Sequence, residues 1–510
     1  MLNRPALPLI VSVVVAIAAG LLVGMGQSPM GVWPATIAGV ALFSWLMVDR
    51  KPRAAFGLGY LTGLALNVLT VSWISVLGTP VAAALIVFLA LWWGLMGWVI
   101  SRLLTLRAWP FLVPAAWVAM EFASGKVPFG GFSWTRLAYT TIDQPLSGFL
   151  AWVGVTGTGY IVALLAQALL LAVTHRHWRL KMLAATVAVF FVGGLLNWTP
   201  LATPEQGVRV AMVQPNVNRA EHGTATYARS VSNNALSETI FAMAIARTTD
   251  DPVDFVLWPE NATDVDPIND AETRKLVEAA IRVAQVPVFV GAVTDGPVPD
   301  SRQTSSIWWD PASGPGAEYH KRDLVPFGEW IPFREFLLPR LPILKQIGRQ
   351  SIPGEGPGVV TGPLDELPDL KVGTIICFEL AYDSTSYDTV RGGAEILVSQ
   401  SNTNTYGGTF QPHQQLTINR VRAMELGREI GVSTLNSLSG WVDARGRVHD
   451  LTSEFESASR IYTLPLRHNI NLSVHLGPWL PWIAVLASLG GVAYSYVPRR
   501  RVDSVGTSDR

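Results

Sequence analysis

Apolar segments long enough to cross a membrane flank one long polar block, and this arrangement constrains the fold more than any other feature of the sequence. Residues 1–198 are almost continuously hydrophobic, residues 199–475 have the composition of a water-soluble domain, and residues 477–497 are hydrophobic again. A helix needs roughly 17–25 mostly apolar residues to cross a bilayer. The sequence therefore predicts a membrane domain at 1–198, an extracytoplasmic α/β domain at 199–475, and a last span with a cytoplasmic tail at 476–510.

About eight segments meet this length criterion, which predicts a polytopic α-helical membrane domain. They are residues 6–24, 32–48, 56–76, 80–100, 108–122, 147–173, 182–198 and 477–497. A mean hydropathy of +0.31 and a charged fraction of 15% agree with a membrane protein. The first segment lacks a convincing small-residue cleavage site and further spans follow it at once, which favours an uncleaved anchor over a signal peptide.

Basic residues gather in every second loop if the spans alternate in direction. They are Arg4, residues 50–53, Arg102, Arg107, residues 176–181 and residues 499–501. The short loops 25–31 and 77–79 between them carry no charge. Because positively charged loops stay in the cytoplasm, we expect both termini on the cytoplasmic side and the 199–475 block on the outer face.

Composition and motifs argue against several classes of partner. The 38 basic and 38 acidic residues balance, and no Lys/Arg-rich stripe indicates a nucleic-acid partner. No Gly-x-x-x-x-Gly-Lys-Ser/Thr loop is present for nucleotide phosphates. The eight histidines form no ligand-like cluster beyond His175 and His177, which fit a cytoplasmic basic loop better than a metal site. We expect neither a metal nor a cofactor.

The polar block alternates short β-rich runs with helical patterns, as an α/β domain does. Strands are expected at 208–213, 255–258, 286–293, 306–309, 372–377 and 396–399, and helices at 224–247, 270–285 and 411–430. The Pro/Gly-rich stretch 327–363 is expected to be a loop. Its apolar part, 336–344, is either a lid that dips into lipid or an ordinary surface excursion.

Three polar side chains, Glu260, Lys321 and Cys377, each lie where a predicted strand ends or shortly beyond an apolar run. Strand ends of open α/β sheets form ligand crevices. Cys377 is the only cysteine of the chain, so it forms no intrachain disulfide and is either an inert side chain or a nucleophile. Taken singly, Glu260 is explained as a helix cap, Lys321 as a solvated loop lysine and Glu329 as a surface carboxylate. Together, a carboxylate, a lysine and a cysteine indicate a catalytic cluster.

The motifs around these residues carry a family resemblance. They are Trp258-Pro-Glu260, Lys321 followed by Leu324-Val-Pro-Phe-Gly-Glu329, and Cys377-Phe-Glu379. They resemble the signature of the nitrilase superfamily, and their combination with about eight spans resembles its membrane-embedded branch, the apolipoprotein N-acyltransferase family. The resemblance implies a nitrilase-like α-β-β-α sandwich in which Glu260 is the general base, Lys321 stabilises the oxyanion and Cys377 is the nucleophile.

The same resemblance implies supporting roles for residues near these motifs. The supporting or substrate-binding residues are Glu329, Glu379, Phe378, Trp258 and Tyr406. If the extended chain continues past Cys377, Glu379 points to the same face as the thiol and can pair with Lys321 or a substrate amine. A lysine close to the thiol is expected to lower the pKa of Cys377, and an adjacent base to take its proton.

The reaction can be narrowed from the location of the domain. Outside the cytoplasmic membrane no ATP or acyl-CoA is at hand, so the acyl donor must already be an ester, and membrane phospholipid is the abundant ester. Cys377 would hold the acyl group as a thioester until an amine enters, the ping-pong logic of covalent catalysis. An α-amino group, with a pKa of about 7.7–8, is a better nucleophile than a protonated lysine. The resemblance implies the acceptor, the S-diacylglyceryl cysteine that begins a bacterial apolipoprotein, at the periplasmic face of the inner membrane.

Two other functions use the same features. A membrane-anchored amidase or nitrilase would employ the same residues and pass the acyl group to water, although eight spans are an excessive anchor for a soluble substrate. A transporter or scaffold would carry a catalytically dead outer domain. The spans hold few of the ionisable residues that mark transport pathways. Glu121 is the main exception, and we expect it to bind a headgroup or a neighbouring loop.

Overall fold

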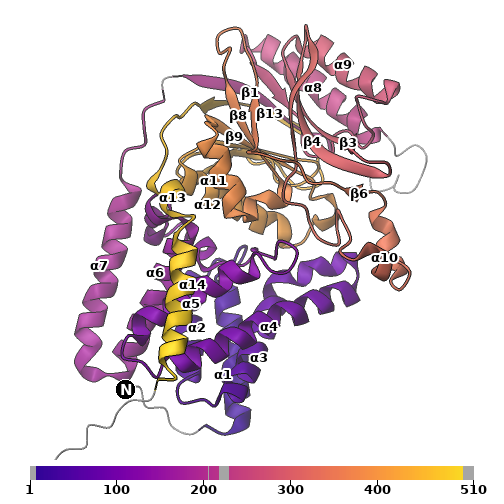
Figure 1. Ribbon diagram of the computed structural model, residues 1–510. Coiled ribbons are helices and arrows are strands. Elements are labelled where there is room, and N and C mark those ends of the chain that lie inside the picture. The colour runs from indigo at the N-terminus through magenta and orange to yellow at the C-terminus, as the bar shows by residue number, and fades with distance from the viewer. Residues whose placement is uncertain (1–6, 205, 218–228, 498–510) are drawn as a thin grey trace, which may run out of the picture.

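The computed structural model describes residues 7–204, 206–217 and 229–497, and it has two parts, a bundle of helices and an α/β sandwich that rests on one end of it (Figure 1). Some expectations lie outside the described residues. These are the first residues of the helix expected at 224–247, and the basic positions Arg4 and 499–501 of the orientation argument.

Each predicted span coincides with a helix. The helices are α1 (Leu9–Met25), α2 (Trp33–Leu46), α3 (Pro52–Val71), α4 (Thr79–Leu103), α5 (Trp109–Ser124), α6 (Leu150–Thr174), α7 (Arg179–Asn197) and α14 (Leu480–Tyr494). By length and composition, four stretches can cross a membrane: Pro52–Leu77, Thr79–Leu103, Pro145–Thr174 and Arg176–Asn197. α1, α2 and α14 are shorter apolar helices. The number of spans and their sidedness stay predictions.

Aromatic side chains from three helices meet in the core of the bundle. Phe43, Trp93 and Trp117 pack edge to face, with ring centroids 5.3 Å to 5.9 Å apart, a geometry that the ring quadrupole favours. α7 differs from the other helices because Gly193 is its one buried residue within the described chain. It stands apart from the bundle along most of its length (Figure 1).

The sandwich is built from two sheets. The first has the order β13 (Ala458–Pro465), β1 (Gly207–Gln214), β2 (Phe255–Leu257), β3 (Val288–Asp295), β4 (Ser301–Asp310), β5 (Gly314–His320), with β6 (Gln350–Ser351) beside β4. The second has the order β12 (Val448–His449), β11 (Gly440–Val442), β10 (Ile430–Thr434), β9 (Ile396–Ser401), β8 (Lys371–Ile376), β7 (Val359–Thr361). The central strands β1, β2 and β3 are parallel, as are β8, β9 and β10.

Helices cover the outer face of each sheet. Between the sheets, Phe255 and Phe289 pack in one cluster with Val372 and Ile396. α8 (Ser230–Thr248) and α9 (Ala271–Ala284) cover the first sheet. The helices of the second sheet are α11 (Asp383–Arg391) and α12 (Gln411–Leu426), which lie between the sheet and the bundle (Figure 1). The order of layers is the predicted α-β-β-α.

The six strands and three helices expected from the sequence are present, and several further elements are not apparent from its pattern. β5 contains Gly314, Pro315 and Gly316, which are weak strand formers, and it forms as the antiparallel neighbour of β4. β8 ends at Ile376, one residue before Cys377. The expected extended geometry therefore stops just before the candidate nucleophile.

The stretch 327–363 is mostly irregular, as expected, with the short helix α10 (Arg334–Leu337) and a 3-10 turn at Pro342–Ile347. Phe333 and Phe336 are 71% and 58% exposed. Phe333 also contacts Phe129, with ring centroids 5.6 Å apart. Phe129 belongs to residues 7–198, which hold the predicted spans α1 to α7 and are called the membrane part. Both interpretations of this stretch, lid and surface excursion, stay predictions.

Candidate active site

Cys377 lies at a sharp turn at the end of a central strand. β8 runs parallel to β9, and at Cys377 the chain turns directly into a 3-10 helix, Cys377–Ala381. The φ angle of Cys377 is 53°, in the left-handed region that residues with a side chain rarely adopt. Such strain persists only where surrounding contacts hold it, and it gathers at functional sites. The turn leaves Cys377, a partly exposed residue, at the carboxyl end of the sheet.

Lys321 follows β5 and lies fully inside the site, with only 1% of its surface exposed. Its Nζ donates to Glu260 Oε1 at 3.1 Å and to Glu329 Oε1 at 2.9 Å. The second oxygen of each carboxylate accepts a backbone N–H, from Asn402 at 2.6 Å and from Val325 at 2.7 Å. One ammonium is thus held by two carboxylates that are themselves fixed by the main chain.

Burial and charge set the protonation of this cluster. Burial alone would lower the pKa of Lys321, but Glu260 and Glu329 raise it well above its ordinary value, so the ammonium persists. Burial raises the pKa of Glu260, and Lys321 opposes this shift. A base with a raised pKa is better suited to accept a proton.

The thiol departs from the expectation that a lysine neighbour lowers its pKa. Burial raises the pKa of Cys377, the negative charge of Glu260 adds to the shift, and Lys321 offsets only part of it. The expected depressed pKa is therefore wrong, because burial and the two carboxylates disfavour the thiolate more than Lys321 favours it. The resting group is a thiol, and it needs a base in contact to become a nucleophile.

Glu379 does not pair with Lys321, which is one of its two expected partners; Lys321 pairs with Glu260 and Glu329. Since the 3-10 turn ends the extended geometry, the Glu379 carboxylate points into the protein and is fully buried. Oε1 accepts from the Tyr319 hydroxyl and the Arg322 backbone N–H, both at 2.7 Å, and Oε2 accepts from the Ile376 N–H at 2.8 Å. Burial raises the pKa of Glu379 to about 7. The residue ties the segment around Lys321 to the turn at Cys377.

Trp258, expected to be a supporting or substrate-binding residue, lies in the core and not in the site. It is fully buried among the side chains between the first sheet and α8, and its indole N–H donates to Thr239 Oγ1 at 2.9 Å. Its backbone carbonyl accepts from Gln400 Nε2 at 2.6 Å. Trp258 thus supports the strand end that carries Glu260 and does not line the site.

Phe378 and Tyr406 face the membrane part. The Phe378 ring stacks on Trp134 at 5.5 Å, and Tyr406 meets Trp73 edge to face at 5.1 Å. The indole N–H groups of Trp73 and Trp134 both donate to Gln414 Oε1, at 2.9 Å and 2.7 Å. Burial raises the pKa of the Tyr406 hydroxyl to about 12, and Cys377 adds to that shift. Aromatic side chains from both parts of the molecule therefore pack together beside the turn that carries Cys377.

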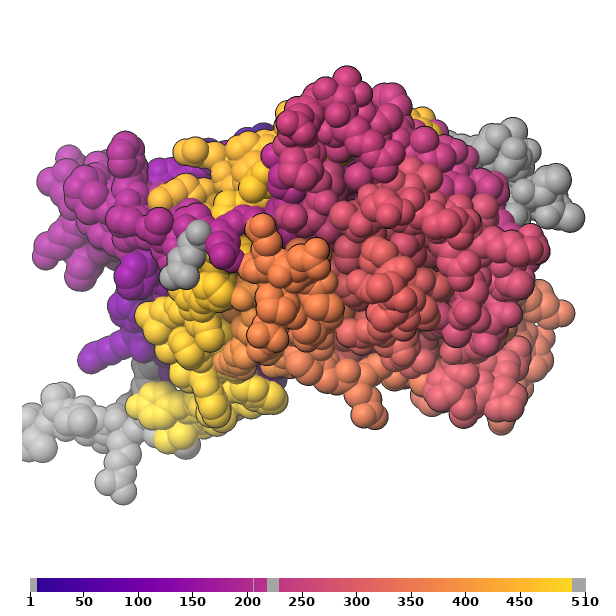
Figure 2. Space-filling model, turned by 90° about the horizontal axis from the view of Figure 1, so that it is seen from above, coloured from indigo at the N-terminus to yellow at the C-terminus, as the bar shows by residue number. Residues whose placement is uncertain are grey.

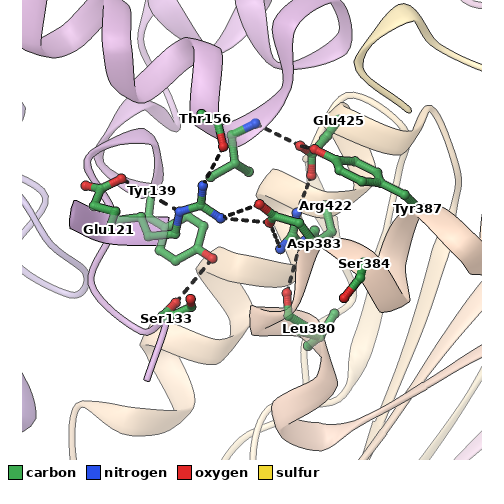
Figure 3. A network of polar contacts seen from close by, with 12 residues as sticks. Glu121, Ser133, Tyr139, Thr156, Leu380, Asp383, Ser384, Tyr387, Arg422 and Glu425 are labelled. Atoms are coloured by element: carbon green, nitrogen blue, oxygen red, sulfur yellow. Dashed lines mark hydrogen bonds and ion pairs between the residues drawn. The ribbon is translucent and has the colours of Figure 1, made fainter. Parts of the chain in front are cut away.

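A second buried cluster joins the two parts and includes Leu380 of the 3-10 turn (Figure 3). Arg136 Nη1 donates to both carboxylate oxygens of Asp383, at 2.7 Å and 2.9 Å, and Arg422 Nη2 donates to the same carboxylate at 2.7 Å. Arg422 Nε also donates to the carbonyl of Leu380, within the 3-10 turn, at 2.8 Å. Sequence reasoning missed the contacts among Arg136, Asp383 and Arg422, since no local motif relates these residues.

Glu121 belongs to this cluster and contacts a neighbouring loop, one of its two expected roles. Its Oε1 accepts the backbone N–H of Leu137 at 2.8 Å, and its Oε2 lies 3.7 Å from Arg136 Nε.

In residues 7–204, 206–217 and 229–497, no group of three or more His, Cys, Asp or Glu side chains is arranged to hold a metal ion.

Comparison with known proteins finds similar sequences over most of the chain. Residues 209–436 match the carbon-nitrogen hydrolase family model, and residues 19–168 match the model of the apolipoprotein N-acyltransferase N-terminal domain. Apolipoprotein N-acyltransferase of Mycolicibacterium smegmatis is 29% identical over 94% of this chain and 83% of its own. That of Vibrio parahaemolyticus is 26% identical over 89% of this chain and 94% of its own. Nit3 of Saccharomyces cerevisiae, a nitrilase-superfamily structure, aligns with 52% of this chain and 93% of its own, with 16% identity and a TM-score of 0.37.

The α-β-β-α fold and the matched family model define the C-terminal part as a carbon-nitrogen hydrolase domain of the nitrilase superfamily, joined here to apolar helices that could span a membrane. The second model and the full-length relatives are specific to one branch. The chain belongs to the apolipoprotein N-acyltransferase family.

Proposed function

We propose that this protein transfers a fatty acyl group from a membrane phospholipid to the N-terminal α-amino group of S-diacylglyceryl cysteine in bacterial apolipoproteins. Its full-length relatives carry the name apolipoprotein N-acyltransferase. The observation that carries the chemistry is the ammonium of Lys321, held between Glu260 and Glu329 beside the only thiol of the chain.

The first half-reaction forms a thioester on Cys377. Glu260 takes the thiol proton as Sγ attacks the acyl carbonyl of the phospholipid, and Lys321 stabilises the oxyanion of the tetrahedral intermediate. When the C–S bond has formed, the ester C–O bond breaks. Glu260 returns the proton to the departing oxygen, and a lysophospholipid leaves.

The second half-reaction transfers the acyl group to the amine. The neutral α-amino group attacks the thioester carbonyl, a C–N bond forms, and the oxyanion again lies beside Lys321. The C–S bond then breaks, and Glu260 carries the amine proton to the sulfur, which restores the thiol. An α-amino group, with a pKa of about 7.7–8, supplies enough neutral amine for this step near neutral pH.

The aromatic side chains of Trp73, Trp134, Phe378 and Tyr406 support a lipid as acyl donor over a soluble compound. Trp73 and Trp134 come from the membrane part and contact Tyr406 and Phe378 beside the thiol. Such an apolar setting suits an acyl chain that enters from the bilayer better than a soluble donor. Together with the charge asymmetry of the loops, this favours a multi-pass protein of the bacterial inner membrane with both termini in the cytoplasm and the catalytic domain on the periplasmic face.

Intact-mass spectrometry of the purified protein tests this function. After incubation with phospholipid, the wild type is expected to gain the mass of one acyl chain, which hydroxylamine removes, and the Cys377→Ala variant is expected to gain none. A lipopeptide with a free N-terminus should discharge the adduct, whereas the same peptide with an acetylated N-terminus should not. Absence of the adduct in the wild type would refute the thioester, and equal discharge by water alone would favour a hydrolase.

A further inference from the structure

A large cleft lies where α7, the start of α6 and the catalytic domain meet, and no residue of the candidate active site lines it. Its volume is about 870 Å³, within the range of sites that hold a ligand. Its walls are residues 142–152, the segment 194–202 at the end of α7, the hairpin residues 444–447 and the segment 469–472. In the view onto the catalytic domain, α7 projects to one side of the molecule and the sandwich does not cover it (Figure 2).

The charges in this cleft are mainly positive. Arg420, Arg445 and Arg447 line it, against one carboxylate, that of Asp143. Arg420 pairs with Asp143, donating at 2.8 Å from Nη1. Two of the three guanidinium charges therefore have no carboxylate partner in the cleft.

The two remaining arginines differ in their contacts. Arg445 donates to the main-chain carbonyls of Asn197 and Thr199, at 2.5 Å and 3.0 Å, which are neutral acceptors. The backbone N–H of Arg447 donates to Asp443 Oδ1 at 2.9 Å. Its guanidinium has no hydrogen bond or ion pair with any residue in the described part of the chain. Both groups are available to an anion.

The surroundings of the cleft are those of a lipid interface. Trp152 and Trp198 line it and are 39% and 85% exposed, and tryptophan is enriched where membranes meet water. α7 touches the bundle closely near this end, where a Cβ on Gly148 would lie 2.1 Å from the carbonyl oxygen of Gly193. Away from this contact, Leu183 and Val187 of α7 are exposed. Acyl chains can therefore lie along α7 below the cleft.

We propose that this cleft binds the headgroup of an anionic phospholipid, distinct from the acyl donor. Arg445 and Arg447 contact the phosphodiester, since guanidinium groups bind phosphate oxygens in pairs. Basic pockets at the cytoplasmic ends of membrane helices bind anionic headgroups in this way, and the same pairing of guanidinium and phosphate applies at this end of α7. The acyl chains pack against α7, and the lipid holds the end of this helix against the catalytic domain.

Native mass spectrometry of the full-length Cys377→Ala protein in detergent tests this site. Because the variant cannot form the thioester, the result does not depend on the proposed acyl transfer. Phosphatidylglycerol is expected to bind at least tenfold more tightly than phosphatidylcholine. The Arg447→Gln change should weaken phosphatidylglycerol binding about fivefold, and the Arg445→Gln/Arg447→Gln pair about 25-fold, from roughly 1 kcal/mol for each basic side chain.

Controls separate the cleft from general charge and from folding. Arg282→Gln removes an exposed arginine of α9, far from the bundle, and should leave phosphatidylglycerol binding unchanged. The single Arg447→Gln variant loses no side-chain hydrogen bond or ion pair within the described residues, so it tests the site even if the double variant does not fold. Equal binding of the two lipids, or undiminished binding by Arg447→Gln, would overturn the site. Displacement of the lipid by millimolar inorganic phosphate would show that the occupant is a free anion, which would also overturn it.

Discussion

Two buried ion clusters of this molecule use different cations, and the difference separates chemistry from positioning. In the candidate active site, the ammonium of Lys321 is the cation that contacts Glu260, at 3.1 Å. At the junction of the two parts, the guanidinium groups of Arg136 and Arg422 converge on Asp383. An ammonium is a compact charge whose donors can turn to a new oxyanion, whereas a guanidinium fork locks the geometry. Lysine suits a cluster that meets a changing substrate, and arginine suits one that must stay in place.

The two clusters meet at the strained turn of Cys377. From one side, the carboxylate of Glu379 accepts the backbone N–H groups of Ile376 and Arg322. From the other, Arg422 donates to the Leu380 carbonyl of the same turn. A non-glycine residue at positive φ costs free energy that surrounding contacts must offset. The position of the nucleophile is thus set by the junction with the membrane part as well as by the sandwich.

The largest expected effect is the loss of the nucleophile. Cys377→Ala and Cys377→Ser should each lower acyl transfer by on the order of 10⁴-fold or more. Alanine has no nucleophilic group, and a serine hydroxyl in the same place is a much weaker acid than the thiol. Transfer is measured with labelled phospholipid and lipopeptide, and thermal unfolding in detergent should be little changed. Wild-type turnover by the serine variant would show that the thiol is not the nucleophile.

Removal of the active-site cation is the next largest effect. Lys321→Ala should slow formation of the acyl adduct by about 10²–10³-fold, the range for loss of one oxyanion donor. Lys321→Arg should not restore the rate, because a planar fork cannot replace a compact ammonium between two carboxylates. Burst-phase adduct formation, followed by mass spectrometry, measures both. An arginine variant as fast as wild type would break the contrast between the two clusters.

The pH dependence of adduct formation tests the base. Glu260 must be ionised to accept the thiol proton, and its pKa is raised by burial. The rate should therefore fall as pH is lowered through this raised pKa, and stay level above it, since the pKa of the thiol is raised as well. Glu260→Gln should remove this dependence and slow the step by about 10²–10⁴-fold. A wild-type rate that does not change with pH on the acid side would exclude Glu260 as the base.

The junction cluster should affect stability more than chemistry. Asp383→Asn leaves Arg136 and Arg422 without their shared carboxylate and should lower the free energy of unfolding by about 3 kcal/mol, the cost of breaking a buried pair. Although burial opposes it, the two arginines lower the pKa of Asp383, so this contribution is present above the ordinary Asp pKa and is lost as pH falls through the depressed value. Denaturant titration in detergent measures the change. An unchanged stability would mean that the cluster does not hold the two parts together.

The smallest effect belongs to an exposed pair across the same junction. Asp143→Asn removes the partner of Arg420, but Asp143 is largely exposed, and such pairs contribute less than 1 kcal/mol. This variant is the matched control for Asp383→Asn, because both remove one carboxylate between the two parts. A loss as large as that of Asp383→Asn would show that burial does not distinguish the two pairs.

The sequence by itself determined the main features of this protein. The apolar segments and the alternation of strands and helices depend on local composition and period, which are readable without a structure. Glu260, Lys321 and Cys377 could be predicted because each lies in a short motif near a strand end. The structure brings the charges of these three residues within interacting distance. Their catalytic roles stay predictions.

Only the tertiary structure decided how these groups act on one another. The direction of the thiol pKa depends on burial and on two carboxylates that share the lysine, and the partners of Glu379 depend on a turn at Cys377 that its neighbours do not reveal. Arg136 and Asp383 are 247 positions apart along the chain. Contacts over such distances leave no periodic or motif signal, because they form only when separate folded layers pack together. The charged cleft beside α7 arises for the same reason.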